Sequence, residues 1–147
     1  MIKLIGVWKM ADWFKEAIID LINKESLATV IRRYGFKRGY FLKLNDHRDS
    51  YYVVSRNRVK LVNLARDIEA LRDERNRRLK LAETPEEQME IEKEYSYMLG
   101  MLLDDPEIYV YHESEKRDVY RYAYDIILVN TGMDYLVCDL LGEVDIY

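Results

Sequence analysis

Cysteine, proline and histidine are scarce in this chain of 147 residues, which contains one cysteine, two prolines and two histidines. The single cysteine, Cys138, excludes a disulfide within the chain and is typical of a reducing compartment. The histidines, His47 and His112, lack the spacing of metal ligands, and the chain has no glycine-rich phosphate-binding loop. We therefore expect no metal, no cofactor and no enzymatic activity.

Long hydrophobic runs are also missing. No apolar stretch approaches the roughly 18 residues that a membrane-spanning helix needs. The first nine residues have too short an apolar centre for a signal peptide. Hydrophobic types make up 49% of the residues and charged types 34%, which is typical of a globular domain. We therefore expect no membrane association and a cytoplasmic protein.

Charge is divided unevenly along the chain, although the net charge is only −4. Residues 1–82 hold 19 Lys/Arg and 10 Asp/Glu, whereas residues 83–147 hold 4 Lys/Arg and 17 Asp/Glu. The halves therefore carry +9 and −13. Such a division is typical of a chain whose basic half binds a polyanion. The alternative is that the two halves neutralise each other in the folded protein.

Short helical and strand patterns alternate in the first 57 residues. Asp12 and Ser26 suit N-caps, and Gly35 suits the left-handed position after the helix that Ser26 begins. Two runs rich in aromatic and branched residues then surround a polar tip, which predicts a β-hairpin. We expect a strand at 2–8, helices at 13–22 and 27–34 around a turn at 23–25, and hairpin strands at 40–44 and 51–55 around a tip at 45–50.

A helical hairpin is predicted over residues 58–104. The first helix runs from about 58 to 81, and the second begins after Thr84 with Pro85 at its first position and Glu87 completing a capping box. Apolar residues follow a heptad spacing that suits pairing of the two helices. A hairpin this short buries little by itself, so we expect it to pack on the chain's own β-region or on a second copy of the chain. The predicted seam consists of Leu61, Leu64, Ile68, Leu71, Ile91, Tyr95, Met98 and Leu102.

The remainder of the chain has strand patterns. They lie at 108–111, 119–129, 135–138 and 144–147, with turns at Thr131–Gly132 and at Gly142. We expect an α+β protein with three segments in one compact unit. These are an N-terminal winged-helix-like segment at 1–57, an antiparallel helical hairpin at 58–104 and a C-terminal antiparallel β-meander at 105–147.

Residues 16–55 carry a resemblance to a known family. The run from Glu16 to Leu21, a short turn, the capped segment from Ser26 to Tyr34 and the basic step Lys37-Arg38-Gly39-Tyr40 precede the predicted hairpin. This order is similar to that of winged helix-turn-helix DNA-binding domains, and the tip resembles the wing of MarR-type repressors. The resemblance implies a transcriptional regulator that binds double-stranded DNA as a homodimer.

A recognition helix needs a polar outward face, which the helix after Ser26 supplies with Thr29, Arg32 and Arg33. Basic side chains downstream suit contacts to phosphates, and the tip suits a minor groove. The predicted DNA-binding residues are Ser26, Thr29, Arg32, Arg33, Lys37, Arg38, Lys43, His47 and Arg48.

Two other interpretations remain open. The first is a small phage- or viral-type protein that inhibits or adapts a partner protein, in which the acidic C-terminal half covers a basic surface. Such a protein would act in the host cytoplasm. The second is a homo-oligomer in which opposite charges of neighbouring copies attract.

Overall fold

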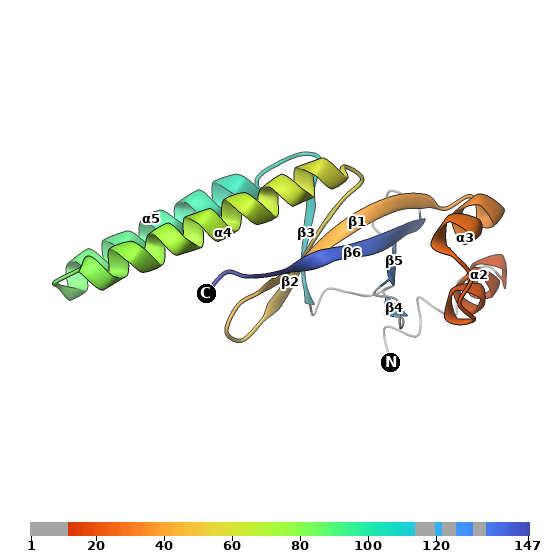
Figure 1. Cartoon of the computed structure of the whole chain (residues 1–147), viewed down its shortest axis with the longest axis horizontal. Coiled ribbons are helices and arrows are strands. Elements are labelled where there is room, and N and C mark those ends of the chain that lie inside the picture. The colour runs from red at the N-terminus through yellow and green to blue at the C-terminus, as the bar shows by residue number, and fades with distance from the viewer. Residues whose placement is uncertain (1–11, 114–119, 122–125, 131–134) are drawn as a thin grey trace.

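The computed structural model describes residues 12–113, 120–121, 126–130 and 135–147 of the chain. These residues form an α+β protein in which one sheet carries a pair of short helices at one end and a pair of long helices at the other (Figure 1). The helices are α2 (Asp12–Ile22), α3 (Leu27–Tyr34), α4 (Arg58–Leu81) and α5 (Pro85–Leu103). The strands are β1 (Lys37–Asn45), β2 (Ser50–Ser55), β3 (Tyr109–His112), β4 (Tyr120–Arg121), β5 (Ile126–Asn130) and β6 (Tyr135–Asp145).

The described strands form a single sheet in the order β3-β2-β1-β6-β5-β4. β1 pairs with β6 in parallel, whereas the other neighbouring strands are antiparallel. Of the predicted C-terminal antiparallel meander, β4, β5 and β6 pair in chain order, but the meander does not include β3 and does not stand apart from the N-terminal strands. β6 lies against β1 in the middle of the sheet, and β3 joins the far side of β2. Strand patterns identify the strands but leave their partners undetermined, because any two strands can supply the same ladder.

β6 is one long strand, where two strands and a turn at Gly142 were predicted. The pairing with β1 shifts by one residue between Phe41 and Leu42, which pair with Leu140 and Gly142. Gly142 therefore lies at a β-bulge inside the strand, a position where glycine is common. The predicted strand at 2–8 and the predicted turn at Thr131–Gly132 lie outside the described residues.

The two short helices pack against each other and against the sheet. Ser26 begins α3 by accepting a hydrogen bond from the Thr29 N–H at 3.1 Å. Gly35 ends the helix at φ 73°, where an L side chain is strained, and its N–H donates to the Ile31 carbonyl. The small core of this end consists of Ala17, Ile18, Leu21, Val30, Phe36 and Val137.

The two long helices form an arm, residues 58–103, that begins on the sheet and extends beyond it (Figure 1). Asn57 caps α4 by accepting from the Lys60 N–H, and Thr84 caps α5 by accepting from the Glu87 N–H. The residues of α4 that are buried against the sheet, Leu61, Leu64 and Ile68, all lie in the first half of the helix. Since a helix of 24 residues is about 36 Å long, the second half extends beyond the sheet. The core beneath it consists of Leu42, Leu44, Val53, Leu61, Leu64, Ile68, Ile108 and Val144.

The end of the chain fastens the arm to the sheet. Tyr95 donates its hydroxyl to the Ile146 carbonyl, and Arg75 donates to the same oxygen at 3.3 Å. The Arg75 guanidinium also lies 4.3 Å from the centre of the Tyr95 ring. Arg72 donates to the Asp145 carbonyl at 2.7 Å. The middle of the arm is thus held by the last residue of β6 and by the residue that follows it.

Candidate functional site

The predicted recognition helix has its polar face in solvent, but much of that face is already engaged. Arg33 forms an ion pair with Asp20 of α2 at 2.9 Å, and Tyr34 donates its hydroxyl to the same carboxylate at 2.8 Å. The bond to Asp20 raises the pKa of Arg33 and, for the same reason, the pKa of Tyr34. The hydroxyls of Ser26 and Thr29 lie 2.6 Å apart within the helix cap. Arg32 is exposed and makes no ion pair or hydrogen bond with the described residues.

The basic side chains of β1 face acidic side chains of β6, its parallel neighbour. Arg38 pairs with Asp139 at 2.9 Å, and Lys43 lies 3.8 Å from Glu143. Lys37, at the start of the strand, is exposed. Two of the predicted phosphate contacts are thus neutralised by carboxylates of the same molecule.

Further ion pairs join the basic and acidic halves of the chain. Lys60 lies 2.7 Å from Asp105 and 3.0 Å from Glu107, and Arg78 lies 2.8 Å from Glu94. The hydrogen bonds to these carboxylates raise the pKa of Lys60, and Lys60 in turn lowers the pKa of Asp105. Part of the charge division seen in the sequence is therefore internal neutralisation.

The predicted wing tip lies far from the recognition helix. α3 is joined to the first residue of β1 by Gly35 and Phe36, whereas the tip follows the last residue of β1. At about 3.3 Å per residue, the nine residues of β1 separate the two by roughly 26 Å. Figure 1 shows the tip and α3 at opposite ends of the sheet. At the tip Arg48 is exposed, and the His47 ring lies 4.1 Å from the Tyr147 ring. The structure therefore does not bring the predicted DNA-binding residues onto one surface.

The predicted seam divides into a buried part and an open part. Leu61, Leu64 and Ile68 are buried beneath α4 against the protein's own sheet, so they are unavailable to a second chain. Ile91 and Tyr95 are buried between the helices of the arm. The remaining seam residues, which are Leu71, Met98 and Leu102, are only partly covered.

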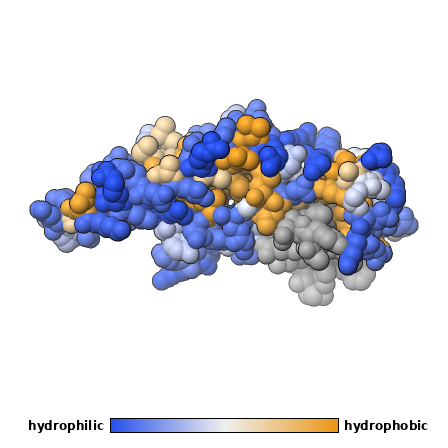
Figure 2. Space-filling model, in the orientation of Figure 1, coloured by the Kyte–Doolittle hydropathy of each residue, from blue (hydrophilic) through white to orange (hydrophobic). Residues whose placement is uncertain are grey.

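An apolar groove of about 410 Å³ runs between α4 and α5 on the open side of the arm. We call it the arm groove, and it is lined by Asp67, Ala70, Leu71, Met98, Met101 and Leu102. Met101 is 61% exposed and Met98 is 44% exposed. In Figure 2, pale orange patches interrupt the hydrophilic surface of the arm near the end of α5 that meets the sheet. Leu71 and Met98 also line a second hollow farther along, which ends at the Arg78–Glu94 ion pair.

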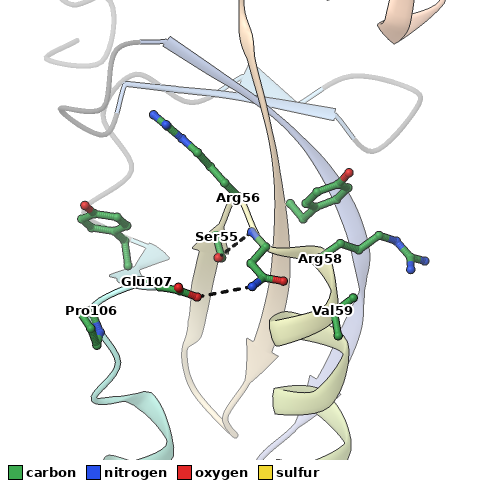
Figure 3. Close-up of a pocket in the computed structure, with 9 residues that line it drawn as sticks. Ser55, Arg56, Arg58, Val59, Pro106 and Glu107 are labelled. Carbon is green, nitrogen blue, oxygen red and sulfur yellow. Dashed lines mark hydrogen bonds between the residues drawn. The ribbon is translucent and has the colours of Figure 1, made fainter.

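A second, larger pocket of about 560 Å³ opens where β2 leads into α4 (Figure 3). Ser55 and Asn57 are among its lining residues, and the Asn57 N–H donates to the Ser55 hydroxyl at 3.0 Å. The Arg56 and Arg58 side chains point away from each other (Figure 3). Glu107 accepts a hydrogen bond from the Asn57 side chain at 3.5 Å. The other lining residues of the pocket are Tyr40, Val59, Pro106 and Tyr109. This pocket was not predicted from the sequence, although the run Arg56-Asn57-Arg58 at the end of a strand pattern was a visible signal.

Among the described residues no His, Cys, Asp and Glu side chains gather as a metal site would require. Cys138 is buried in β6, and this burial raises the pKa of its thiol to about 12. A nucleophilic cysteine needs the opposite shift.

None of the helices in the described part of the chain is both long enough and apolar enough to cross a membrane. Comparison with known protein families, with curated proteins and with solved structures found no match.

Proposed function

We propose that the protein is a non-catalytic binding protein that associates with a second copy of itself through the arm groove. The observation that carries this proposal is the row of partly exposed apolar residues along α4 and α5. Met98 and Met101 together expose a flexible, polarisable surface of the kind that is enriched at protein interfaces. Contiguous apolar surface on an extended arm is typical of a site that another protein covers.

Charge selects the second copy as the occupant. α4 contains eight basic and four acidic residues, whereas α5 contains one basic and five acidic residues. The two helices therefore carry net charges of +4 and −4. When two arms stack in the same direction about a two-fold axis along the arm, α4 of each copy lies over α5 of the other. Stacking in opposite directions would place helices of like charge together, which costs free energy.

Self-association is tested by placing a charge in the middle of the groove. We expect the wild-type protein to form dimers in sedimentation equilibrium and the Met98→Glu variant to dissociate, because a buried carboxylate without a partner is costly. Met89→Glu is the matched control. Met89 lies on the same helix and is 61% exposed, but it does not line the groove. We also expect dissociation to increase with salt, since screening weakens the contacts between α4 and α5 of different copies.

Wild-type protein that remains monomeric at millimolar concentration would refute the proposal. Equal dimer stability in the Met98→Glu and Met89→Glu variants would also refute it, because the contact would then lie elsewhere on the surface.

A second candidate function is regulation of transcription through DNA binding by α3. The observation that favours it is Arg32, which is exposed on the outer face of a capped helix and makes no ion pair or hydrogen bond with the described residues. An arginine in this position suits a guanine edge or a phosphate. Since the tip is distant, we propose contact by α3 alone and not by a helix and a wing together.

DNA binding is tested by gel shift with duplex at low salt. We expect Arg32→Ala to weaken binding and Arg48→Ala to leave it unchanged, because Arg48 lies at the tip of the hairpin. Affinity is expected to fall as salt rises, since phosphate contacts release counterions. Absence of any shift at low salt, or equal losses in both variants, would contradict binding through α3.

A further inference from the structure

The hollow between α4 and α5 that adjoins the arm groove is lined by a buried arginine. This hollow, which we call the arm hollow, has a volume of about 360 Å³, and Arg75 in its lining is only 9% exposed. The Arg75 Nε donates to the Asn76 side chain at 3.0 Å, and Nη1 donates to the Ile146 carbonyl at 3.3 Å. The second Nη1 hydrogen and both Nη2 hydrogens make no hydrogen bond with the described residues. The two terminal nitrogens of the guanidinium thus retain a pair of donors of the kind that binds a carboxylate.

The charge of Arg75 is also uncompensated, because it forms no ion pair within the described part of the chain. The other charged residues that line the arm hollow are paired with one another. Arg77 donates to both oxygens of the Glu74 carboxylate. Arg78 lies 2.8 Å from Glu94. Each lining glutamate therefore has its own arginine, and the lining keeps an excess of one positive charge.

This excess favours an occupant with a single negative charge, since a buried charge without a counterion is costly. A carboxylate carries that charge and matches an arginine fork. A phosphate monoester carries about −1.5 to −2 at neutral pH, so it would place additional negative charge beside Glu74 and Glu94.

The rest of the lining is apolar or aromatic. Ile91 and Tyr95 of α5 are buried, and the Tyr95 ring covers one face of the Arg75 guanidinium at 4.3 Å. Leu71 and Met98 line both the arm hollow and the arm groove. An alkyl chain that extends from a carboxylate at Arg75 would bury apolar surface along these side chains. The volume of the arm hollow lies within the range of about 300–1,000 Å³ that small-molecule sites have.

We propose that the arm hollow binds a carboxylate that carries an alkyl chain, as a fatty acid does. Its carboxylate accepts from Arg75, and its chain lies along Leu71 and Met98. The ligand supplies the counterion that the described residues do not give to Arg75. The proposal does not rest on self-association of the arm, because Arg75 does not line the arm groove.

Titration calorimetry with octanoate, acetate and 1-octanol tests the proposal on the full chain at pH 7. We expect octanoate to bind. Acetate and 1-octanol should each bind at least about tenfold more weakly, since each retains only one of the two contacts. Octyl phosphate should bind no more tightly than octanoate, because of its additional charge beside the two glutamates.

Variants of the arginine test where the carboxylate binds. Arg75→Met should weaken octanoate binding about tenfold or more, because it removes the charge and the donors together. Arg75→Lys keeps the charge but loses the planar fork, so its affinity should be intermediate. Arg66→Met is the matched control, because Arg66 is exposed on the same helix and does not line the arm hollow. Circular dichroism verifies that each variant is folded.

Absence of octanoate binding at millimolar concentration would overturn the proposal. So would binding of 1-octanol as tight as that of octanoate, or tighter binding of octyl phosphate. Equal affinities of Arg75→Met and Arg66→Met for octanoate would show that the carboxylate binds elsewhere and would overturn it as well.

Discussion

Removal of the Tyr95 hydroxyl tests whether its hydrogen bond to the Ile146 carbonyl stabilises the packing of the arm on the sheet. The Tyr95 side chain is buried, and its hydroxyl donates to the Ile146 carbonyl, which also accepts from Arg75. Tyr95→Phe keeps the ring and its contact with the guanidinium but removes one hydrogen bond. Because Arg75 still serves the carbonyl, we expect a loss of about 1 kcal/mol in the free energy of unfolding. For a domain of this size that loss lowers Tm by about 2–4 °C.

A double-mutant cycle with Arg75→Met makes the expectation sharper. Arg75→Met removes the second donor and the cation–π contact, which contributes about 0.5–2 kcal/mol. In the double variant the Ile146 carbonyl loses both donors, so its unsatisfied oxygen adds about 1–3 kcal/mol. The double variant should therefore lose more stability than the sum of the single variants.

Urea denaturation measures these differences, with Tyr97→Phe as the control. Tyr97 lies on the same helix and is 71% exposed, so its substitution should change stability by less than about 0.5 kcal/mol. Burial raises the pKa of Tyr95. The stabilisation by its protonated hydroxyl is therefore present below the ordinary tyrosine pKa of about 10 and is lost as pH rises through the higher folded value. Equal stability of the two phenylalanine variants at pH 7, or strictly additive losses in the cycle, would show that the shared hydrogen bonds to the Ile146 carbonyl do not stabilise the protein in this way.

Three further outcomes are expected. Ile68→Ala should lose about 2–5 kcal/mol at any protein concentration, because Ile68 is a core residue beneath α4, whereas Met101→Ala should change the unfolding free energy of the monomer little. Lys60 lowers the pKa of Asp105, so this pair stabilises the fold above a pH of about 4 and ceases to do so as pH falls through the lower folded value. Urea midpoints from pH 6 to pH 2 should therefore fall more for the wild type than for Lys60→Met. Alkylation of Cys138 should require unfolding, since its thiol is buried and has a pKa of about 12; rapid labelling of the native protein would contradict its place in β6.

The helices of this protein were predictable because their signals are local. Ser26 and Thr84 cap helices as predicted, and Gly35 ends α3 in the left-handed conformation. Periodicity and caps act within a few residues, so the predicted bounds of the long helices agree with those of α4 and α5. The prediction of an α+β protein is confirmed at this level.

The partners of each element were not predictable in the same way. The spacing of Leu61, Leu64 and Ile68 identified an apolar stripe but left open whether it covers the chain's own β-region or a second copy, and in the structure it covers the sheet. The positive charge of Arg38 was visible, whereas its pairing with Asp139 depends on two strands that meet from opposite ends of the chain. Both failures have one physical cause, because burial and ion pairing depend on tertiary neighbours that a one-dimensional pattern does not name.

The parallel pairing of β1 with β6 has a consequence for how the molecule acquires its structure. Arg38 and Asp139, which meet across these strands, are separated by 101 positions in the chain. Contacts of such long range are slow to form, because the loop between them must be closed before they contribute stability. During synthesis, α4 and α5 can assemble when β1 has paired with β2 but β6 has not yet been made. The exposed edge of β1 would then be the region of the nascent polypeptide that most needs protection from aggregation.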